Sequence, residues 1–308
     1  MKVKLTADEL LDSVSEHTGT LRKAVWLRHI RYNEKTYGFN RTISDLRDSY
    51  KGEKVVVIGA GPGFKRFGTD DLHLIRNEKL KTGRPIVIAC DGALSTLSGV
   101  ELVPDYVNTV DAHPVVANFF RRNLDLLKRV QGVFLATSIH RDVVEAVGEA
   151  GVLKYWWQPW FKPNSKAHFS TGFYRDGVTS INTGGNVGTT SYIIAAEILR
   201  CRPIGLMGLE FAWSDETPLA DTQYFTHLMK AVNDDPVVAR EHYLTVKNPR
   251  DGKTYMADPV YYSYFTALRG MWRYGLSRDI KKNTYLLTKQ GIINLRGLKY
   301  VEVDEFLK

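Results

Sequence analysis

The sequence predicts an α/β fold: a Rossmann-like parallel sheet with helices on both faces, an N-terminal helical appendage and a C-terminal extension. From Lys54 onward, short apolar runs bounded by turn residues alternate with helical stretches. The runs are apolar at nearly every position, which indicates parallel strands buried on both faces. The expected strands are Val55–Ile58, Ile86–Cys90, Tyr106–Val110, Val133–Ala136, Leu153–Trp157 and Ile204–Met207.

The composition is that of an ordinary globular protein, because 44% of the 308 residues are hydrophobic and 25% are charged. No apolar run approaches the roughly 18 residues that a membrane-spanning helix needs. The first residues, MKVKLTADEL, lack the apolar region of a secretory signal. Two cysteines, Cys90 and Cys201, exclude a disulfide framework and favour a reducing compartment. We therefore expect a cytoplasmic protein without a membrane partner.

The net charge of +8 raises the question of a nucleic-acid partner. The excess of Lys and Arg lies in residues 1–51 and 231–308, whereas residues 52–230 are nearly balanced. Without a dense basic block, a solvated basic surface is the favoured interpretation, and nucleic acid is the alternative. The sequence does not indicate an oligomeric state.

We expect three regions along the chain. Residues 1–51 form a helical appendage, which opens on the capping box Thr6–Glu9, is broken near Gly19 and ends in a second helix over Ile43–Tyr50. Residues 52–225 form the Rossmann-like nucleotide-binding domain. Residues 226–308 form a C-terminal helical extension, closed by a last strand or short element over Lys299–Phe306.

Two long segments fall outside the strand–helix alternation, and both are candidate lids. Residues 211–262 combine a loop, a helix from Gln223 and a polar turn. Residues 156–180 are polar but rich in aromatic side chains, which bury planar ligands well. A satellite hydrophobic cluster beneath a long loop is the equal alternative. The aromatic residues are Trp156, Trp157, Trp160, Phe161, Phe169, Phe173 and Tyr174.

The first glycine-rich turn follows the strand Val55–Ile58 directly. Gly59, Gly61 and Gly63 lack side chains, so backbone N–H groups could approach the phosphates of a nucleotide. The turn is similar to a dinucleotide fingerprint, but Phe64 stands where the third glycine belongs. A tight turn without a ligand is the alternative.

The second glycine-rich turn leads straight into an apolar helix. The residues Gly184, Gly185, Asn186, Gly188 and Thr189 precede or open this helix, whose first N–H groups have no partners within it. These N–H groups and the positive end of the helix dipole suit a phosphate. The turn lacks the lysine of a P-loop, and an elaborate helix cap is the alternative.

Three carboxylates follow strand ends. Asp91 comes after IVIAC, Asp111 after YVNTV and Glu210 after IGLMGL. The carboxyl ends of parallel strands share one rim, so these side chains are candidate ligands of Mg²⁺ that bridges ATP phosphates. Each could instead cap the following helix. His113 could donate to a phosphate or serve as an acid or base, and an ordinary loop histidine is the equal alternative. Asp111 and His113 are the candidate catalytic residues.

In this order and spacing, VVVIGAGPG, IVIACDGALSTL, PDYVNTVD, TGGNVGTTS and IGLMGLEFAW resemble the 6-hydroxymethylpterin diphosphokinase MptE-like family, which includes a domain of motility accessory factors. The resemblance covers about residues 52–225. It implies a Rossmann-like fold and Mg²⁺- and ATP-dependent pyrophosphoryl transfer to a dihydropterin hydroxymethyl group. Related members are associated with sugar transfer to flagellin.

The resemblance also assigns positions. Glu210 stands where the family often has aspartate, and Gly63 where serine is common. Near the C-terminus, Asn294-Leu295-Arg296-Gly297 replaces an Asn-x-Thr-Glu-Gly-Gly pattern. The matching positions are Gly59, Gly61 and Pro62, then Asp91, Gly92 and Asp111, then Gly184, Gly185, Asn186 and Gly188.

The leading hypothesis is therefore an Mg²⁺-dependent transferase that uses ATP and a small hydroxymethyl acceptor. A glycosyltransferase using a nucleotide-activated sugar is the first alternative. A nucleotide- or nucleic-acid-binding protein without catalysis is the second, because one fold hosts many chemistries.

Overall fold

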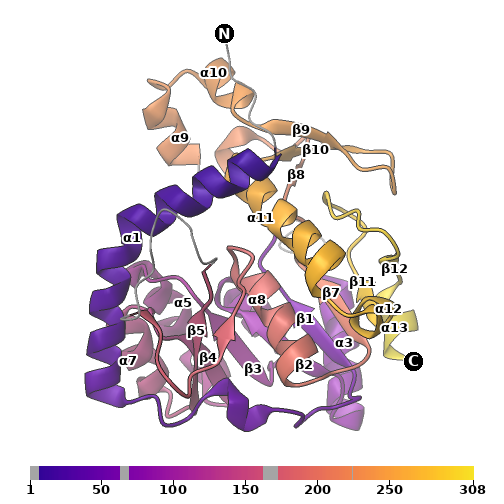
Figure 1. Cartoon of the computed structure of the whole chain (residues 1–308). Helices are drawn as coiled ribbons and strands as arrows, with labels where there is room; N and C mark the ends of the chain where they lie inside the picture. The colour runs from indigo at the N-terminus through magenta and orange to yellow at the C-terminus, as the bar shows by residue number, and fades with distance from the viewer. Residues whose placement is uncertain (1–6, 63–68, 162–172, 224) are drawn as a thin grey trace.

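The computed structural model describes residues 7–62, 69–161, 173–223 and 225–308. Within these ranges, nine parallel strands form one sheet, which confirms the predicted parallel sheet (Figure 1). Their order is β12-β11-β7-β1-β2-β3-β4-β5-β6. The strands are β1 (Val55–Ile58), β2 (Ile86–Cys90), β3 (Tyr106–Thr109), β4 (Gly132–Ala136), β5 (Lys154–Pro159), β6 (Ser180–Ile181), β7 (Ile204–Met207), β11 (Thr284–Leu286) and β12 (Lys299–Tyr300).

The strand order changes direction at β1. From β1 the chain proceeds outward through β2 to β6, and β7 then pairs with the other side of β1. The carboxyl ends of β1 and β7 therefore flank the switch point, where open α/β sheets bind their ligands. We therefore expect a ligand to bind at the carboxyl ends of these two strands.

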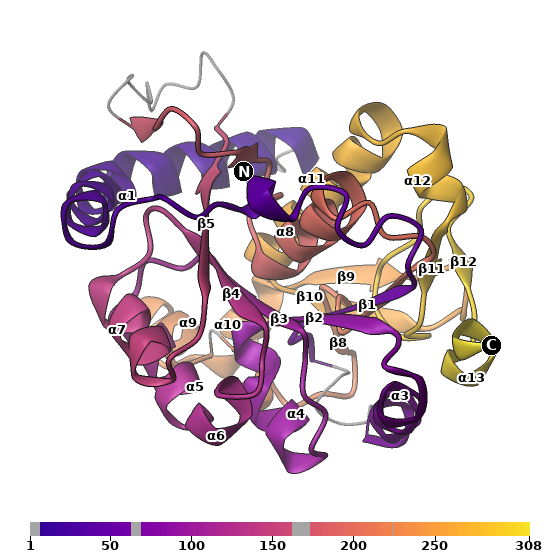
Figure 2. The same ribbon diagram turned by 90° about the horizontal axis from the view of Figure 1, so that it is seen from below.

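Helices cover both faces of the sheet, which confirms the predicted layering (Figure 2). Successive strand residues enter different cores: Val55 and Val57 belong to one, and Val56 and Ile58 to the other. One face carries α3 (Thr69–Thr82), α4 (Leu94–Gly99), α5 (Ala117–Arg121), α6 (Leu124–Leu127) and α7 (Arg141–Glu149). The other carries α1 (Ala7–Tyr37), α8 (Val187–Ile193), α11 (Pro259–Gly270) and α12 (Arg278–Lys282).

The N-terminal helix α1 runs unbroken through Gly19, so the predicted break is wrong. A helical glycine costs only about 1 kcal/mol relative to alanine, and α1 packs along α11. Its Asn33 side chain donates hydrogen bonds to the backbone oxygens of Thr137 and Ile139, just beyond β4. The second predicted helix is shorter than expected, because only the 3₁₀ turn Ile43–Leu46 forms.

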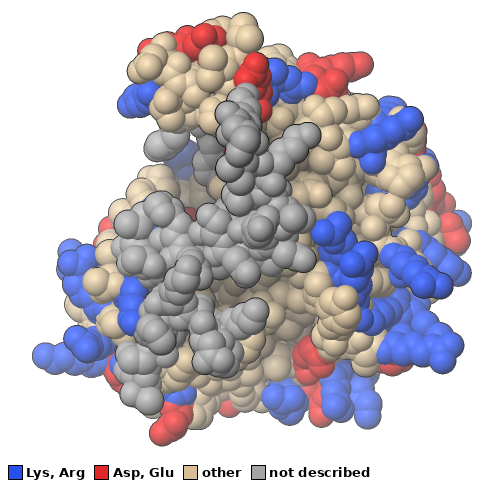
Figure 3. Space-filling model, turned by 45° about the horizontal axis from the view of Figure 1, so that its top comes forward, with Lys and Arg blue, Asp and Glu red and all other residues tan. Residues whose placement is uncertain are grey.

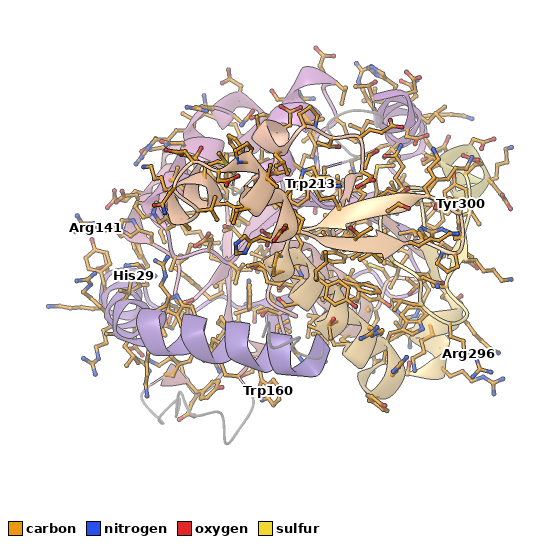
Figure 4. The ribbon with its side chains drawn as sticks, turned by 90° about the horizontal axis from the view of Figure 1, so that it is seen from above. His29, Arg141, Trp160, Trp213, Arg296 and Tyr300 are labelled. Atoms are coloured by element: carbon orange, nitrogen blue, oxygen red, sulfur yellow. The ribbon has the colours of Figure 1, made fainter. Side chains whose placement is uncertain are left out.

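His29 also fixes α1 to the loop after β4, because its Nδ1 lies 3.1 Å from the Ser138 carbonyl oxygen. Its ring meets the His140 ring edge to face, on the side of α1 near Arg141 (Figure 4). Burial lowers the pKa of His29 below its ordinary value of 6.5, and the His140 and Arg141 charges act in the same direction.

The unfolded chain therefore takes up this proton more readily than the folded chain. We expect the free energy of unfolding to fall as the pH drops below about 6.5, and His29→Gln to remove part of that dependence. Urea unfolding at pH 7.5 and 5.5 measures both, with the exposed His73→Gln as the control. Equal pH dependence in wild type and His29→Gln would contradict this prediction.

The segment 211–262 contains a sheet that we did not predict. Strands β8 (Trp213–Ser214), β9 (Leu244–Lys247) and β10 (Thr254–Ala257) form an antiparallel sheet, which stands with α9 (Phe225–Ala231) and α10 (Pro236–Glu241) at the top of Figure 1. We call these elements the upper lobe. β8 has two residues and β9 is largely exposed, so neither leaves an apolar run in the sequence.

The aromatic segment 156–180 is partly core. Trp156 and Trp157 lie in β5 and are buried in the cores on opposite faces of the sheet. Phe173 is fully buried, and Phe161 stacks on Trp26 of α1 at 5.4 Å. The cluster alternative therefore holds for Phe161 and Phe173, whereas Trp156 and Trp157 are part of the main cores and Phe169 lies outside the described ranges.

The C-terminal region contributes to the main sheet. β11 pairs with β7, β12 pairs with β11, and the predicted closing element Lys299–Phe306 is β12 followed by α13 (Val303–Leu307). Within the described residues, no helix is long and apolar enough to cross a membrane. On the face shown in Figure 3, Lys and Arg gather toward the right-hand edge.

Candidate functional site

Loops from distant parts of the chain meet at the switch-point rim. They follow β1, β2, β7 and β11, and the turn before α8 joins them. The contacts are so close that a Cβ atom would not fit at several glycines. These pairs are Gly59 with Gly208, Gly61 with Glu210, Gly92 with Ala60, and Gly291 with Glu210, and Gly188 lies in a tight contact with Leu209.

The first glycine-rich turn is joined to the loop after β7. The Gly59 N–H donates to the Met207 carbonyl oxygen, and the Gly61 N–H donates to that of Gly208, both at 2.8 Å. These two N–H groups thus serve the packing of two loops, a role that we did not predict. Gly63, the third predicted contact of this turn, lies outside the described residues.

Gly61→Ala tests this packing role. A Cβ atom at position 61 would lie 2.6 Å from the Gly208 carbonyl oxygen and still closer to the Glu210 carboxylate. We expect overpacking to lower the free energy of unfolding by about 1–3 kcal/mol. Gly270→Ala, in open space at the end of α11, should instead stabilise by about 0.5–1 kcal/mol. Equal stability of the two variants in urea would contradict the prediction.

The second glycine-rich turn is a compact helix cap. Gly184 and Gly185 have φ angles of +55° and +83°, which glycine adopts readily. The Asn186 Oδ1 accepts the Thr189 N–H at 2.8 Å, and the Asn186 amide also donates to the Thr189 hydroxyl. We predicted this cap only as the alternative to a phosphate site, and the structure shows that the cap is present.

Several donors of this turn are used within it. The Gly184 and Gly185 N–H groups donate to the side chains of Asn182 and Thr183. The helix then begins at Val187 and continues without interruption as a π-helical stretch to Ile198. The N–H groups of Val187 and Gly188, in the first turn of the helix, have no helical acceptor. They are the donors that remain for an anion.

The beginning of α8 lies over the ends of β2 and β3. The Asn108 amide of β3 donates to the Ser191 hydroxyl at 3.0 Å, and the Cys90 sulfur of β2 is 4.0 Å from the same oxygen. α8 packs against β1, β2 and β3. These contacts place α8 over the ends of the two strands that Asp91 and Asp111 follow.

Asp91 is a buried carboxylate with two internal hydrogen bonds. The Thr109 hydroxyl donates to Oδ2 at 2.5 Å, and the Gly92 N–H donates to Oδ1 at 2.6 Å. Burial raises the pKa of Asp91 to about 6, and the negative charge of nearby Asp111 acts in the same direction. A cation at this position would relieve both effects. Thr109 was missed, because a threonine inside a strand carries no separate signal.

Asp111 and His113 form an exposed turn at the end of β3. The Asp111 Oδ1 accepts the His113 N–H at 3.0 Å, and the His113 Nδ1 accepts the Val115 N–H at 3.2 Å. His113 is thus the N-cap of the 3₁₀ turn Pro114–Val116. Its Nε2 carries the hydrogen of the neutral ring and is the edge left for a ligand.

Glu210 is buried, with 2% of its surface exposed, between Gly61 and Gly291. Among the described residues, no three His, Cys, Asp or Glu side chains are grouped to hold a metal ion. The three predicted carboxylates therefore do not form a ready-made triad. Since Mg²⁺ commonly binds one or two carboxylates plus substrate phosphates, Asp91 and Asp111 suit such a site without Glu210.

The 6-hydroxymethylpterin diphosphokinase MptE-like family model matches residues 29–216, more than half of the chain. The chain belongs to this family. No curated protein matches it significantly. Among solved structures, it is similar to the MAf glycosyltransferase from Magnetospirillum magneticum AMB-1, with 15% identity and a TM-score of 0.54.

That similarity covers 84% of this chain but 35% of the other protein, so our chain spans about a third of its length. At this identity the likeness shows the fold. It agrees with the predicted Rossmann-like architecture, and the family match confirms the predicted family.

Proposed function

We propose that this family member is a transferase that binds the phosphates of ATP at the beginning of α8 and transfers pyrophosphate to a hydroxymethyl acceptor. The observations that carry the proposal are that α8 packs over the ends of β2 and β3, where Asn108 donates to Ser191, and that the carboxylates Asp91 and Asp111 follow these two strands. Phosphate oxygens would accept the N–H groups that the helix leaves free.

The carboxylate pair fits a hard divalent cation. Asp91 keeps two acceptor oxygens with spare lone pairs, and Asp111 is exposed beside it. Mg²⁺ held here would neutralise charge on the bridging phosphate oxygens. The protein's own part is to fix Asp91 through Thr109 and Gly92, so that this carboxylate does not have to reorganise.

The acceptor hydroxyl would lie on the His113 side. In the balanced reaction, the hydroxyl oxygen attacks the β-phosphorus of ATP and its proton passes to solvent water, while the bond from that phosphorus to the α,β-bridging oxygen breaks. AMP leaves with that oxygen. The His113 Nε2–H can donate to a phosphate oxygen and position the group, because its Nδ1 is held by Val115.

The products test this proposal. Incubation of the chain with ATP, Mg²⁺ and a hydroxymethyl dihydropterin should yield AMP and the pyrophosphorylated pterin, without ADP. Separation of nucleotides by chromatography measures the outcome. Formation of ADP, or no ATP consumption by a chain that binds ATP, would contradict pyrophosphoryl transfer.

Glycosyl transfer is the second candidate, and one observation favours it. The likeness to the MAf glycosyltransferase covers 84% of the chain and so extends beyond the family match. A nucleotide sugar presents the same diphosphate to the α8 N-terminus and to Mg²⁺. Release of a nucleoside diphosphate from a panel of nucleotide sugars, with no AMP formed from ATP, would replace the first candidate with this one.

A further inference from the structure

The tip of the β9–β10 hairpin reaches from the upper lobe down to the rim. Asn248 is buried at this tip, and its side-chain amide donates to the Gly291 carbonyl oxygen at 2.8 Å. The Arg250 Nη2 donates to the Lys289 carbonyl oxygen at 3.1 Å. Gly291 lies directly against Glu210, which lies against Gly61 of the first glycine-rich turn. The hairpin tip therefore ends at the switch point.

Arg250 is a half-buried cation that the proposed reaction has not used. Within the described residues, no carboxylate lies within 4.0 Å of its guanidinium, and the buried Nε–H has no hydrogen-bond acceptor. Its neighbour Asp251 is engaged elsewhere, because its oxygens accept the Tyr255 hydroxyl and the Lys253 N–H. Asp251 adds its negative charge nearby but forms no ion pair with Arg250, so a partly buried guanidinium N–H stays unsatisfied, and this position suits a bound anion.

The surroundings of Arg250 face the first turn of α3. Burial lowers the pKa of Arg250, which the charge of Asp251 opposes. Tyr300 lies near both Arg250 and Asp71, a residue of the first turn of α3, and its hydroxyl donates to Glu302. Glu302 in turn pairs with Lys289. Glu302 is thus engaged by Tyr300 and Lys289, and among the ion pairs of the described residues it makes none with Arg250.

We propose that Arg250 binds the pyrophosphate portion of the nucleotide donor at the switch point. A guanidinium presents several N–H donors in one plane, a geometry that matches phosphate oxygens. ATP and a nucleotide sugar both contain a pyrophosphate group. This role of Arg250 rests on the proposed function only for the identity of the donor. The upper lobe then contributes directly to substrate binding through one residue.

The affinity ratio between ATP and AMP tests this role in the full chain by isothermal titration with Mg²⁺ present. Arg250→Gln should reduce the preference for ATP over AMP about tenfold, with the affinity for AMP unchanged. Arg250→Lys should lose less, because it keeps the charge. Arg296→Gln removes an exposed arginine of the C-terminal segment, away from Tyr300 in Figure 4, and is the matched control.

Two further arms separate this inference from the proposed function. For the second donor, the measured quantity is the ratio of the affinities for a nucleotide sugar and for the nucleoside monophosphate. Titration with inorganic pyrophosphate alone probes the anion site. If wild type binds pyrophosphate through Arg250 but no nucleotide, the proposed function fails and the anion site stands. An unchanged ATP-to-AMP ratio in folded Arg250→Gln and Arg250→Lys, or no binding of pyrophosphate by wild type, would overturn the role of Arg250.

Discussion

Asp111→Asn is expected to lower the turnover of the transfer reaction about a hundredfold while leaving the melting temperature unchanged. The side chain is exposed, and its contact inside the protein is the hydrogen bond that Oδ1 accepts from the His113 N–H. Asparagine keeps an oxygen for that bond, so the turn survives and the negative charge alone is lost. Steady-state kinetics across a Mg²⁺ titration measure the effect.

Asp125→Asn is the matched control, because Asp125 on α6 is almost fully exposed, and α6 leads into the amino end of β4, opposite to the carboxyl ends that form the rim. It should leave turnover and Mg²⁺ dependence as in wild type. Asp91→Asn should lower turnover as well, although its burial and two hydrogen bonds make a loss of stability an added effect. If Asp91→Asn and Asp111→Asn both keep the Mg²⁺ dependence of the wild type, the two carboxylates do not bind Mg²⁺ and only cap the segments that follow their strands.

The sheet could be predicted because its central strands are apolar without interruption. Val55–Ile58, Ile86–Cys90 and Ile204–Met207 have the predicted bounds, since burial on both faces leaves no polar position. The two- and three-residue strands β6, β8 and β11 leave no such run, so they were missed. The pairing of β7 with β1, which creates the switch point, depends on contacts between segments about 150 residues apart.

The glycines show why the site was harder to predict than the fold. Sequence reasoning interpreted Gly59 and Gly61 as room for phosphate, but the structure fills that room with Gly208 and Glu210 from the loop after β7. A glycine indicates that the backbone packs closely against another group. The sequence does not identify that group, because it lies far away along the chain. Arg250 carried no signal at all, because only the fold of the upper lobe brings it to the rim.

Val187→Asp should separate a phosphate site at α8 from a mere helix cap. Val187 is the first residue of the helix and is partly exposed, and an acidic residue there interacts favourably with the dipole by about 0.3–1 kcal/mol. The same charge would repel a phosphate bound to the Val187 and Gly188 N–H groups. Two unit charges about 5 Å apart repel by about 3 kcal/mol at an effective dielectric constant of about 20.

Asparagine has nearly the same shape as aspartate but carries no charge. Comparing Val187→Asp with Val187→Asn therefore isolates the effect of the charge. We expect Val187→Asp to bind ATP at least tenfold more weakly than Val187→Asn, with an equal or higher melting temperature. This pair is a sharper test than a bulky residue at Gly185, where any side chain would meet the Tyr264 ring and strain a backbone with φ of +83°. Equal ATP affinities in the two folded variants would leave α8 with an ordinary cap, and the phosphates would have to bind elsewhere on the rim.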